Sequence, residues 1–377
     1  TETVNTLRLW EAKSPQGFDL QLFNDQKYLE ASASAVKAED LSRVLYPNDT
    51  ERSGKELRLK QQYFFVSASL QDIVRKDKEK YGNVFSGFAD KIAIQLNDTH
   101  PVVAIPELMR IFLDSEKISW VEAWEICQKV FSYTNHTVLA EALEKWDISI
   151  FNSLLPRVYQ IIEEINRRFM TEISKKYPED WAKQQRMSII GNGEVRMAWL
   201  AIVGTHAING VAAIHTEILK HQTLKDWYEL YPEKFQNKTN GVTQRRWLLK
   251  ANPELAGYIT SLIGSEWVTD LSELKKLEKY IEDDNVLNKL LEIKHKKKQD
   301  LAEYIKENNN IEVNIDSIFD VQVKRLHEYK RQLLNVFHIM DLYNKIKENP
   351  LLEIVPRTFI FGAKAAPGYR RAKSIIK

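Results

Sequence analysis

A cluster of basic side chains stands between a strand and a helix in DVQVKRLHEYKRQLL, residues 320–334. Phe319, Val321 and Val323 alternate as in a strand, and the apolar residues that follow have helical spacing. Ligands of open parallel sheets gather beyond the carboxyl ends of strands, and helix N-termini favour anions. The stretch therefore suits a phosphate site, although a solvated basic helix start would use the same residues. The cations are Lys324, Arg325, Lys330 and Arg331.

Two other loops carry polar side chains that suit either sugar hydroxyls or helix capping. In LNDTHP, Asp98 and His100 follow a short apolar strand and precede a helix. In YTNHTVL, His136 stands at a similar helix entry. From the residues alone, both a capping role and a sugar-binding role stay open for each loop.

The elements that must position these residues follow from hydrophobic spacing. From position 317 onward the order is strand, helix, strand, helix, which is how a doubly wound parallel sheet begins. A polar loop is expected at 46–56, with Pro47 and Gly54 as helix breakers. A domain boundary near 236–250 separates 1–240 from 241–377. Helices are expected at about 25–45, 57–80, 102–113, 119–131, 154–175 and 270–308.

The bulk composition describes a globular chain with a local anion site at most. The 377 residues suffice for two domains, and 44% of them are apolar. A net charge of +2 disfavours a general polyanion binder such as a nucleic-acid protein. The single cysteine, Cys127, lies on the apolar face of a predicted helix and indicates a buried structural thiol. This cysteine usage favours the cytoplasm, and no apolar run is long enough to span a membrane.

The sequence lacks the motifs that would indicate several other kinds of site. The histidines show no H-E-x-x-H spacing and have no cysteine partner, so no metal site is predicted. No G-x-S-x-G motif indicates a serine nucleophile. A glycosidase with paired carboxylates stays open, because nothing singles out two acids.

Six motifs, in order, resemble the α-glucan phosphorylases of the glycogen and starch type. The similarity runs over essentially the whole chain. It implies an α/β fold of two Rossmann-like domains that face a cleft, the GT-B type of glycosyltransferase fold. Both ends look cut, so we expect this fold to be incomplete at both ends. The motifs are RVLYPND, GKELRLKQQY, IQLNDTHP, YTNHTVL, NKTNGVT with RRW, and DVQVKRLHEYKRQLLN.

The resemblance implies phosphorolysis of terminal α-1,4-glucosidic bonds with orthophosphate, which releases glucose 1-phosphate. It also implies pyridoxal phosphate as cofactor, acting through its 5′-phosphate. Unit charges about 4 Å apart repel by about 4 kcal/mol at an effective dielectric of ~20, so two neighbouring phosphates need several fixed cations. The implied partners are an α-1,4-glucan and orthophosphate, with no nucleic acid and no membrane, in a homodimer. The Schiff-base lysine is expected beyond Lys377, so these 377 residues alone are expected to be inactive.

Roles on the phosphate side carry over by position. Arg325 matches the arginine that binds the substrate phosphate, and Lys330 matches the lysine between the two phosphates. Lys324 matches a lysine that contacts the cofactor phosphate, and Trp247 matches a tryptophan beside the cofactor. Arg331 is interpreted as ordinary surface charge.

Roles on the sugar side follow in the same way. His136 and Asn240 match groups that hold the glucosyl O6, and Tyr329 matches a tyrosine that contacts sugar hydroxyls. Asp98 and His100 match residues that line the sugar side of the cleft. The resemblance thus assigns catalysis to Arg325, Lys330 and His136.

The remaining assignments concern a gate and some departures from the pattern. Asp49 lies in a loop that matches a mobile gate, and His327 resembles a supporting residue near it.

The sequence departs from the family pattern at three positions. Gln244 and Ala140 replace prolines, and Ala363 replaces a glycine. None of these changes removes a charge, so activity is expected to survive them.

Two alternative functions stay open at this point. One is a GT-B glycosyltransferase that uses nucleotide sugars and no cofactor. The other is a non-catalytic glucan-binding relative, which would not need Lys324, Arg325 and Lys330 together. Glucan preference, phosphorylation control and effector sites are not predicted.

Overall fold

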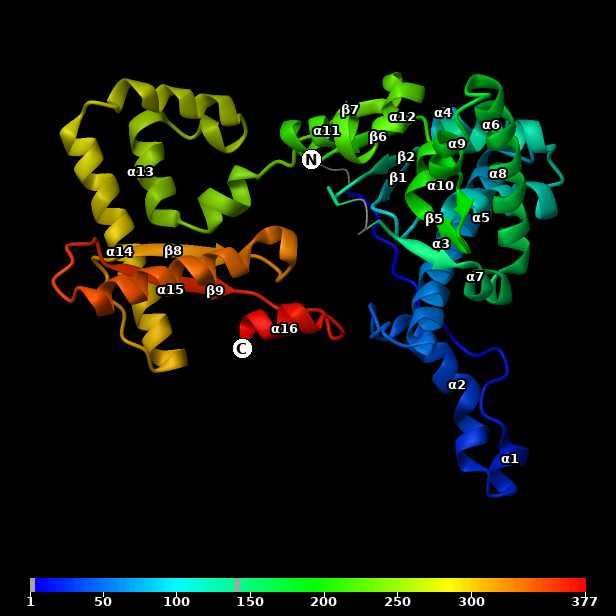
Figure 1. Cartoon of the computed structure of the whole chain (residues 1–377), viewed down its shortest axis with the longest axis horizontal. Coiled ribbons are helices and arrows are strands. Elements are labelled where there is room, and N and C mark those ends of the chain that lie inside the picture. The colour runs from blue at the N-terminus through cyan, green and yellow to red at the C-terminus, as the bar shows by residue number, and fades with distance from the viewer. Residues whose placement is uncertain (1–3, 140–142) are drawn as a thin grey trace. The chain divides into compact units, whose positions relative to one another are not determined.

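The computed structural model describes residues 4–139 and 143–377. The chain divides into two compact units, Thr1–Asn240 and Gly241–Lys377 (Figure 1). Each unit has its own hydrophobic cluster, and that of the first unit is much the larger. The units are described separately below.

The first unit is built on a sheet of parallel strands in the order β1-β2-β6-β7. Alternate side chains of the strands, such as Leu96, Phe131 and Tyr133, are buried, which fixes the register. Because all pairs are parallel, the carboxyl ends of the strands meet at one edge of the sheet. The strands are β1 Ile94–Asn97, β2 Phe131–Thr134, β6 Ala207–Gly210 and β7 Phe235–Asn237.

Helices surround this sheet, and a small antiparallel sheet β3-β5-β4 lies beside it. The helices are α1 Leu20–Asn24, α2 Tyr28–Ser42, α3 Arg52–Tyr81, α4 Phe88–Lys91, α5 Ala104–Arg110, α6 Trp120–Val130, α7 Ile148–Leu154, α8 Pro156–Lys176, α9 Trp181–Met187, α10 Met197–Gly204, α11 Ala213–Ile218 and α12 Lys225–Leu230. The small sheet contains β3 Lys145–Asp147, β4 Ile190–Gly191 and β5 Glu194–Arg196.

Sequence patterns explain why the main core helices form where they do. Helix α8 has proline at its first turn, and its predicted apolar stripe is buried from Val158 to Phe169. Helix α6 begins at a Ser119 cap, whose hydroxyl accepts a hydrogen bond from the amide of Glu122. Cys127 is fully buried on α6, and this burial raises the pKa of its thiol. The prediction of a structural thiol is thereby confirmed.

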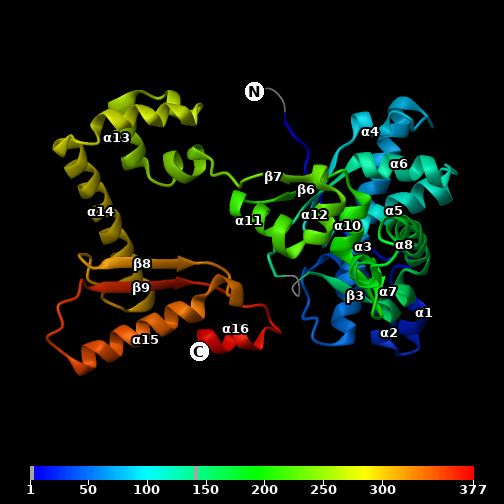
Figure 2. The ribbon, with the colours of Figure 1, turned by 45° about the horizontal axis from the view of Figure 1, so that its top comes forward.

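The second unit begins with α13 Pro253–Ile263 and a charged helical region formed by Leu271–Tyr280 and α14 Asp284–Asn309. Next come β8 Ile318–Val323, α15 Gln332–Glu348, β9 Arg357–Gly362 and α16 Arg370–Ile376. Strands β8 and β9 pair in parallel, and α15 runs along them in both views (Figures 1 and 2). The predicted strand–helix–strand order and the α/β class are confirmed.

The gate region differs from its prediction as a loop over 46–56. Helix α3 already begins at Arg52, so Gly54 lies inside a helix and breaks nothing. Glycine is needed at 54 so that the backbone of Asn48 can pass close to α3, because a Cβ at this position would lie 1.9 Å from the carbonyl oxygen of Asn48.

Among the described residues, no helix combines the length and the apolar character needed to cross a bilayer.

Candidate active site

The loop that joins β8 to α15, residues 324–331, carries the predicted phosphate ligands, and we call it the cationic loop. Its first half is fixed to the end of β9 and the chain after it: the amide of Lys324 donates to the carbonyl of Gly362, the last residue of β9, at 3.1 Å. The amide of Leu326 donates to the carbonyl of Lys364, also at 3.1 Å, and the Leu326 side chain is buried. The backbone is thus anchored while the neighbouring side chains project from it.

The cations of this loop have no acidic partners in the described part of the chain. No carboxylate there lies within 4.0 Å of the charged groups of Lys324, Arg325, Lys330 and Arg331. Lys324, Arg325 and Arg331 are exposed, and Lys330 is half-buried. Unpaired cations held on a fixed backbone at the carboxyl end of a strand favour an anion there. Arg331, the last residue of the loop, has a left-handed backbone with φ of 58°.

The acidic residue of the cationic loop, Glu328, pairs with groups outside the loop, and the aromatic rings of the loop contact each other. The hydroxyl of Tyr369 donates to the carboxylate of Glu328 at 2.7 Å, and Arg371 forms an ion pair with it. These two partners lower the pKa of Glu328, so its charge stays fixed on them. The rings of His327 and Tyr329 lie 4.3 Å apart. Burial and the charge of Lys330 lower the pKa of His327, which favours its neutral form.

Two of the predicted sugar-side residues, His136 and Asp98, lie at the carboxyl edge of the main sheet. His136 follows β2, and its Nε2 lies 2.5 Å from Oδ1 of Asn97, the last residue of the neighbouring β1. Asp98 comes next in the chain and has a left-handed φ of 73°, which is costly for a residue other than glycine. The structure thus brings His136 and Asp98 to the ends of two adjacent strands.

Asn240 is linked to the same edge through a histidine that the sequence patterns did not indicate. Its amide donates to the carbonyl of Val211 at 3.0 Å, and the amide of Val211 donates to Nδ1 of His215. Since Nδ1 accepts, Nε2 of His215 carries the hydrogen and donates to the carbonyl of Thr137 at 3.2 Å. His215 is buried and joins the chain after β2 to the chain before Asn240. In the sequence it stands in an apolar run, which conceals this role.

His100 belongs to a network of charges rather than to a helix cap. Its Nδ1 lies 3.6 Å from Oε1 of Glu144, an ion-pair distance. Arg58 of α3 donates to the same carboxylate at 2.5 Å and to the carboxylate of Asp49 in the gate loop at 2.6 Å. Burial opposes ionisation of Glu144, but His100, Arg58 and Gln62 outweigh it and lower the pKa of the carboxyl group. In turn, Glu144 raises the pKa of His100.

One predicted site residue, Trp247, is not joined to the rest. It lies on the helical turn Arg245–Lys250, and the residue is 64% exposed. No hydrogen bond among the described residues links it to the cationic loop. Ala140 lies in the segment 140–142, outside the described residues.

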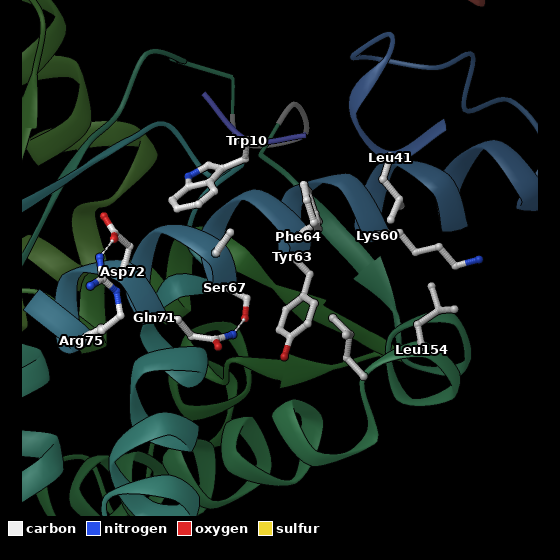
Figure 3. A pocket seen from close by; sticks show the side chains of 12 residues that line it. Trp10, Leu41, Lys60, Tyr63, Phe64, Ser67, Gln71, Asp72, Arg75 and Leu154 are labelled. Atoms are coloured by element: carbon white, nitrogen blue, oxygen red, sulfur yellow. Dashed lines mark hydrogen bonds and ion pairs between the residues drawn. The ribbon is translucent and has the colours of Figure 1, made fainter. Parts of the chain in front are cut away.

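A cavity of about 970 Å³ lies elsewhere on the first unit, along α3 (Figure 3). Its walls include Trp10, Tyr63 and Leu154, and none of the predicted site residues lines it. Asp72 and Arg75, which also line it, form an ion pair at 2.7 Å. The chemistry-bearing residues are therefore those of the sheet edge and the cationic loop.

A parallel α/β architecture with a cationic loop after a strand is typical of doubly wound α/β proteins, whose ligands bind beyond the carboxyl ends of the strands. Within that class, the chain belongs to the carbohydrate phosphorylase family, whose profile matches residues 1–377. The resemblance seen in the sequence is thereby confirmed.

Curated relatives support the same family. Over 385 residues, the chain is 52% identical to the liver form of glycogen phosphorylase from Homo sapiens; this covers 100% of the chain and 46% of that protein. Identity is also 52% to the muscle form from Bos taurus, over 384 residues, with 99% of the chain and 46% of that protein covered. The chain spans about half the length of the curated relatives that it matches.

Proposed function

We propose that the protein containing this chain is an α-glucan phosphorylase, which cleaves terminal α-1,4-glucosidic bonds with orthophosphate and releases glucose 1-phosphate. The observation that carries the proposal is the set of unpaired cations on the anchored cationic loop. Such a set suits two phosphates better than a neutral sugar. The relatives, which are named glycogen phosphorylases, support the choice of substrate.

On the phosphate side, Arg325 binds orthophosphate and Lys330 lies between orthophosphate and the cofactor phosphate. The planar guanidinium of Arg325 matches two phosphate oxygens at once, and its exposure leaves both nitrogens available. Lys330 supplies a point charge that offsets the repulsion between the two anions. Orthophosphate can then protonate the leaving glycosidic oxygen while its negative charge stabilises the positive charge that develops on the sugar.

The residues present fit pyridoxal phosphate as the second anion. Lys324 and Lys330 lack acidic partners in the described residues, which suits a dianionic phosphate group. The exposed indole of Trp247 offers a flat apolar face beside a cofactor. When bound, the cofactor supplies a phosphate whose second pKa, about 6, suits proton exchange near neutral pH.

On the sugar side, we assign hydroxyl contacts to His136, Asp98, His100, Asn240 and Tyr329. The contact between Nε2 of His136 and Oδ1 of Asn97 holds the imidazole in one orientation at the sheet edge. Asp49 acts as a gate residue, and its tie to Arg58 holds it in the observed position. His327 supports the loop through its contact with Tyr329. We also propose that the whole protein is a cytoplasmic homodimer.

The test is phosphorolysis by the full-length protein, supplied with pyridoxal phosphate, orthophosphate and glycogen. Arg325→Gln should lower kcat/KM for orthophosphate by about 10²–10³-fold, as expected when a fixed donor to a developing charge is lost. Arg331→Gln is the matched control, because it removes the same group from the same loop, and it should leave the rate nearly unchanged.

Two results would contradict the proposal. Absence of glucose 1-phosphate with the unmodified protein would refute the function itself. Loss of bound cofactor in Arg325→Gln, measured from its absorbance, would show that Arg325 serves the cofactor instead of orthophosphate.

A further inference from the structure

Gln332, the first residue of α15, has a side chain that turns back against the cationic loop. The residue is only 1% exposed, although the helix start around it is exposed. Its Nε2 donates to the carbonyl of Arg325 at 3.1 Å and to that of Lys324 at 3.4 Å. Its Oε1 accepts from the amide of His327 at 3.5 Å. One side chain thus hydrogen-bonds to three consecutive peptide groups of the loop backbone.

These contacts complete the hydrogen bonding of the first half of the loop. The amides of Lys324 and Leu326 already have partners at the end of β9 and just after it, on one side of the loop. Their counterparts on the other side, two carbonyls and the amide of His327, have Gln332 as partner. Because buried backbone groups need partners, removing Gln332 leaves this stretch free to rearrange.

A second amide holds the other half of the loop. Nε2 of Gln322, on β8, donates to the carbonyl of Lys330 at 3.1 Å. Oε1 of Gln322 accepts from Nδ2 of Asn335 on α15, also at 3.1 Å. The backbones of Arg325 and Lys330 are therefore held by two separate glutamines, and each cation has its own support.

The contacts made by Gln332 require a primary amide of this length. Only a group with two N–H donors and one oxygen acceptor can bond two carbonyls and one amide together. A glutamate at 332 would face two carbonyl oxygens with its negative charge, and a methionine would fill the same space without hydrogen bonds. The residue type is thus explained by the loop and not by the helix that begins there.

We propose that Gln332 is a positioning residue of the orthophosphate site, which holds the backbone of Lys324–His327 so that Arg325 faces the anion. It acts through the loop and does not touch phosphate itself. This inference rests on the proposed function, since it takes Arg325 as the phosphate ligand. No family role was assigned to position 332 from the sequence.

The first test measures hydrogen–deuterium exchange on the 377-residue chain, without any ligand. Gln332→Met should speed exchange in peptides that cover 324–331 by about tenfold, because the amide of His327 loses its partner. Peptides of β8, β9 and α14 should keep their rates. Gln299→Met is the matched control, since Gln299 is an exposed residue of α14 in the same unit, and it should change none of these rates.

The second test uses steady-state kinetics of the full-length protein. Gln332→Met should lower kcat/KM for orthophosphate by about 10–100-fold, the cost of misplacing a binding group by about 1 Å. The KM for glycogen should stay within about twofold, because four of the five sugar-side residues, all except Tyr329, lie in the first unit. Gln332→Glu should likewise lower kcat/KM for orthophosphate and leave the KM for glycogen nearly unchanged, since the substitution removes both N–H donors without changing the volume of the side chain.

The outcomes separate this inference from the proposed function. If the unmodified full-length protein makes no glucose 1-phosphate, the proposed function fails, and faster exchange at 324–331 would no longer imply a phosphate role. If the protein is active and Gln332→Met equals Gln299→Met in both tests, the positioning role is refuted. If both Gln332 variants lose protection throughout the second unit, Gln332 supports the fold as a whole, which also overturns the inference.

Discussion

The backbone of Gly54, inside α3, lies against the carbonyl group of Asn48 in the gate loop. A Cβ added at position 54 would lie 1.9 Å from that oxygen and 2.9 Å from its carbon, which are distances that real atoms do not tolerate. The gate loop can therefore return over the first turn of α3 only because residue 54 has no side chain. This contact places Asp49, the next residue, within reach of Arg58.

Gly54→Ala should destabilise the first unit, although alanine is the better helix former. The gate loop must shift to admit the methyl group, at a cost of about 1–3 kcal/mol. Gly257→Ala in α13 is the matched control, because nothing lies within 4 Å of its Cβ position. There the change should stabilise by about 1 kcal/mol. Hydrogen exchange of α3 and of α13 measures the two effects, and the same sign at both sites would contradict the expectation.

Arg58→Met should weaken the first unit by leaving Glu144 with too few partners. The Glu144 side chain is 7% exposed, and Arg58 is its closest cation. Breaking such a pair costs about 2–4 kcal/mol, at the lower end because Arg58 is partly exposed. Arg75→Met on the same helix is the control: its ion pairs with Asp72 and Glu79 are exposed at the arginine, so stability should barely change.

The pH dependence of the Arg58 variant provides a further check. The folded state lowers the pKa of Glu144 below its ordinary 4.5, so its contribution to stability is present above that value and is lost as pH falls. The difference in unfolding free energy between wild type and Arg58→Met should therefore be largest near neutral pH and should narrow in acid. Urea denaturation over this pH range measures it, and a difference that grew in acid would be incompatible with a charged Glu144.

His100 should contribute the opposite pH dependence. Glu144 raises the pKa of His100 above its ordinary 6.5, so the stabilisation is complete below that value and is lost as pH rises through the raised pKa. Compared with His100→Gln, the wild type should gain more thermal stability at about pH 6 than at about pH 9. His206→Gln is the control, because His206 has no carboxylate partner among the described residues and hydrogen-bonds the carbonyl of Gln128. Equal differences at both pH values would exclude a charged His100.

The sequence predicted the elements that have regular patterns and long motifs. The apolar stripe of α8, the alternation in β8 and the parallel α/β class all follow from local spacing, and the structure agrees with them. The unpaired cations of 324–331 were likewise visible as a cluster. Local spacing was misleading at Gly54, because the reason for a glycine there is a neighbour across the gate loop.

The supporting residues could not be predicted, because their partners are distant in the sequence. Arg58 meets Glu144 across 86 positions, and His215 reaches Thr137 across 78. Gln332 is close in sequence to the loop that it holds, but a glutamine at a helix start is ordinary on composition alone. Its role depends on a side chain that turns back instead of outward, which only the three-dimensional structure reveals.

The side chains that hold the cationic-loop backbone at Lys324, Arg325 and Lys330 are all uncharged amides. Gln332, Gln322 and Asn335 neither gain nor lose protons at any pH that the protein tolerates. The backbone at Lys324, Arg325 and Lys330 should accordingly be insensitive to acidity, in contrast to the gate side, where Glu144 and His100 carry titrating charges. A change of pH would therefore alter the ionisation of whatever the loop binds while the backbone that carries Arg325 and Lys330 keeps its shape.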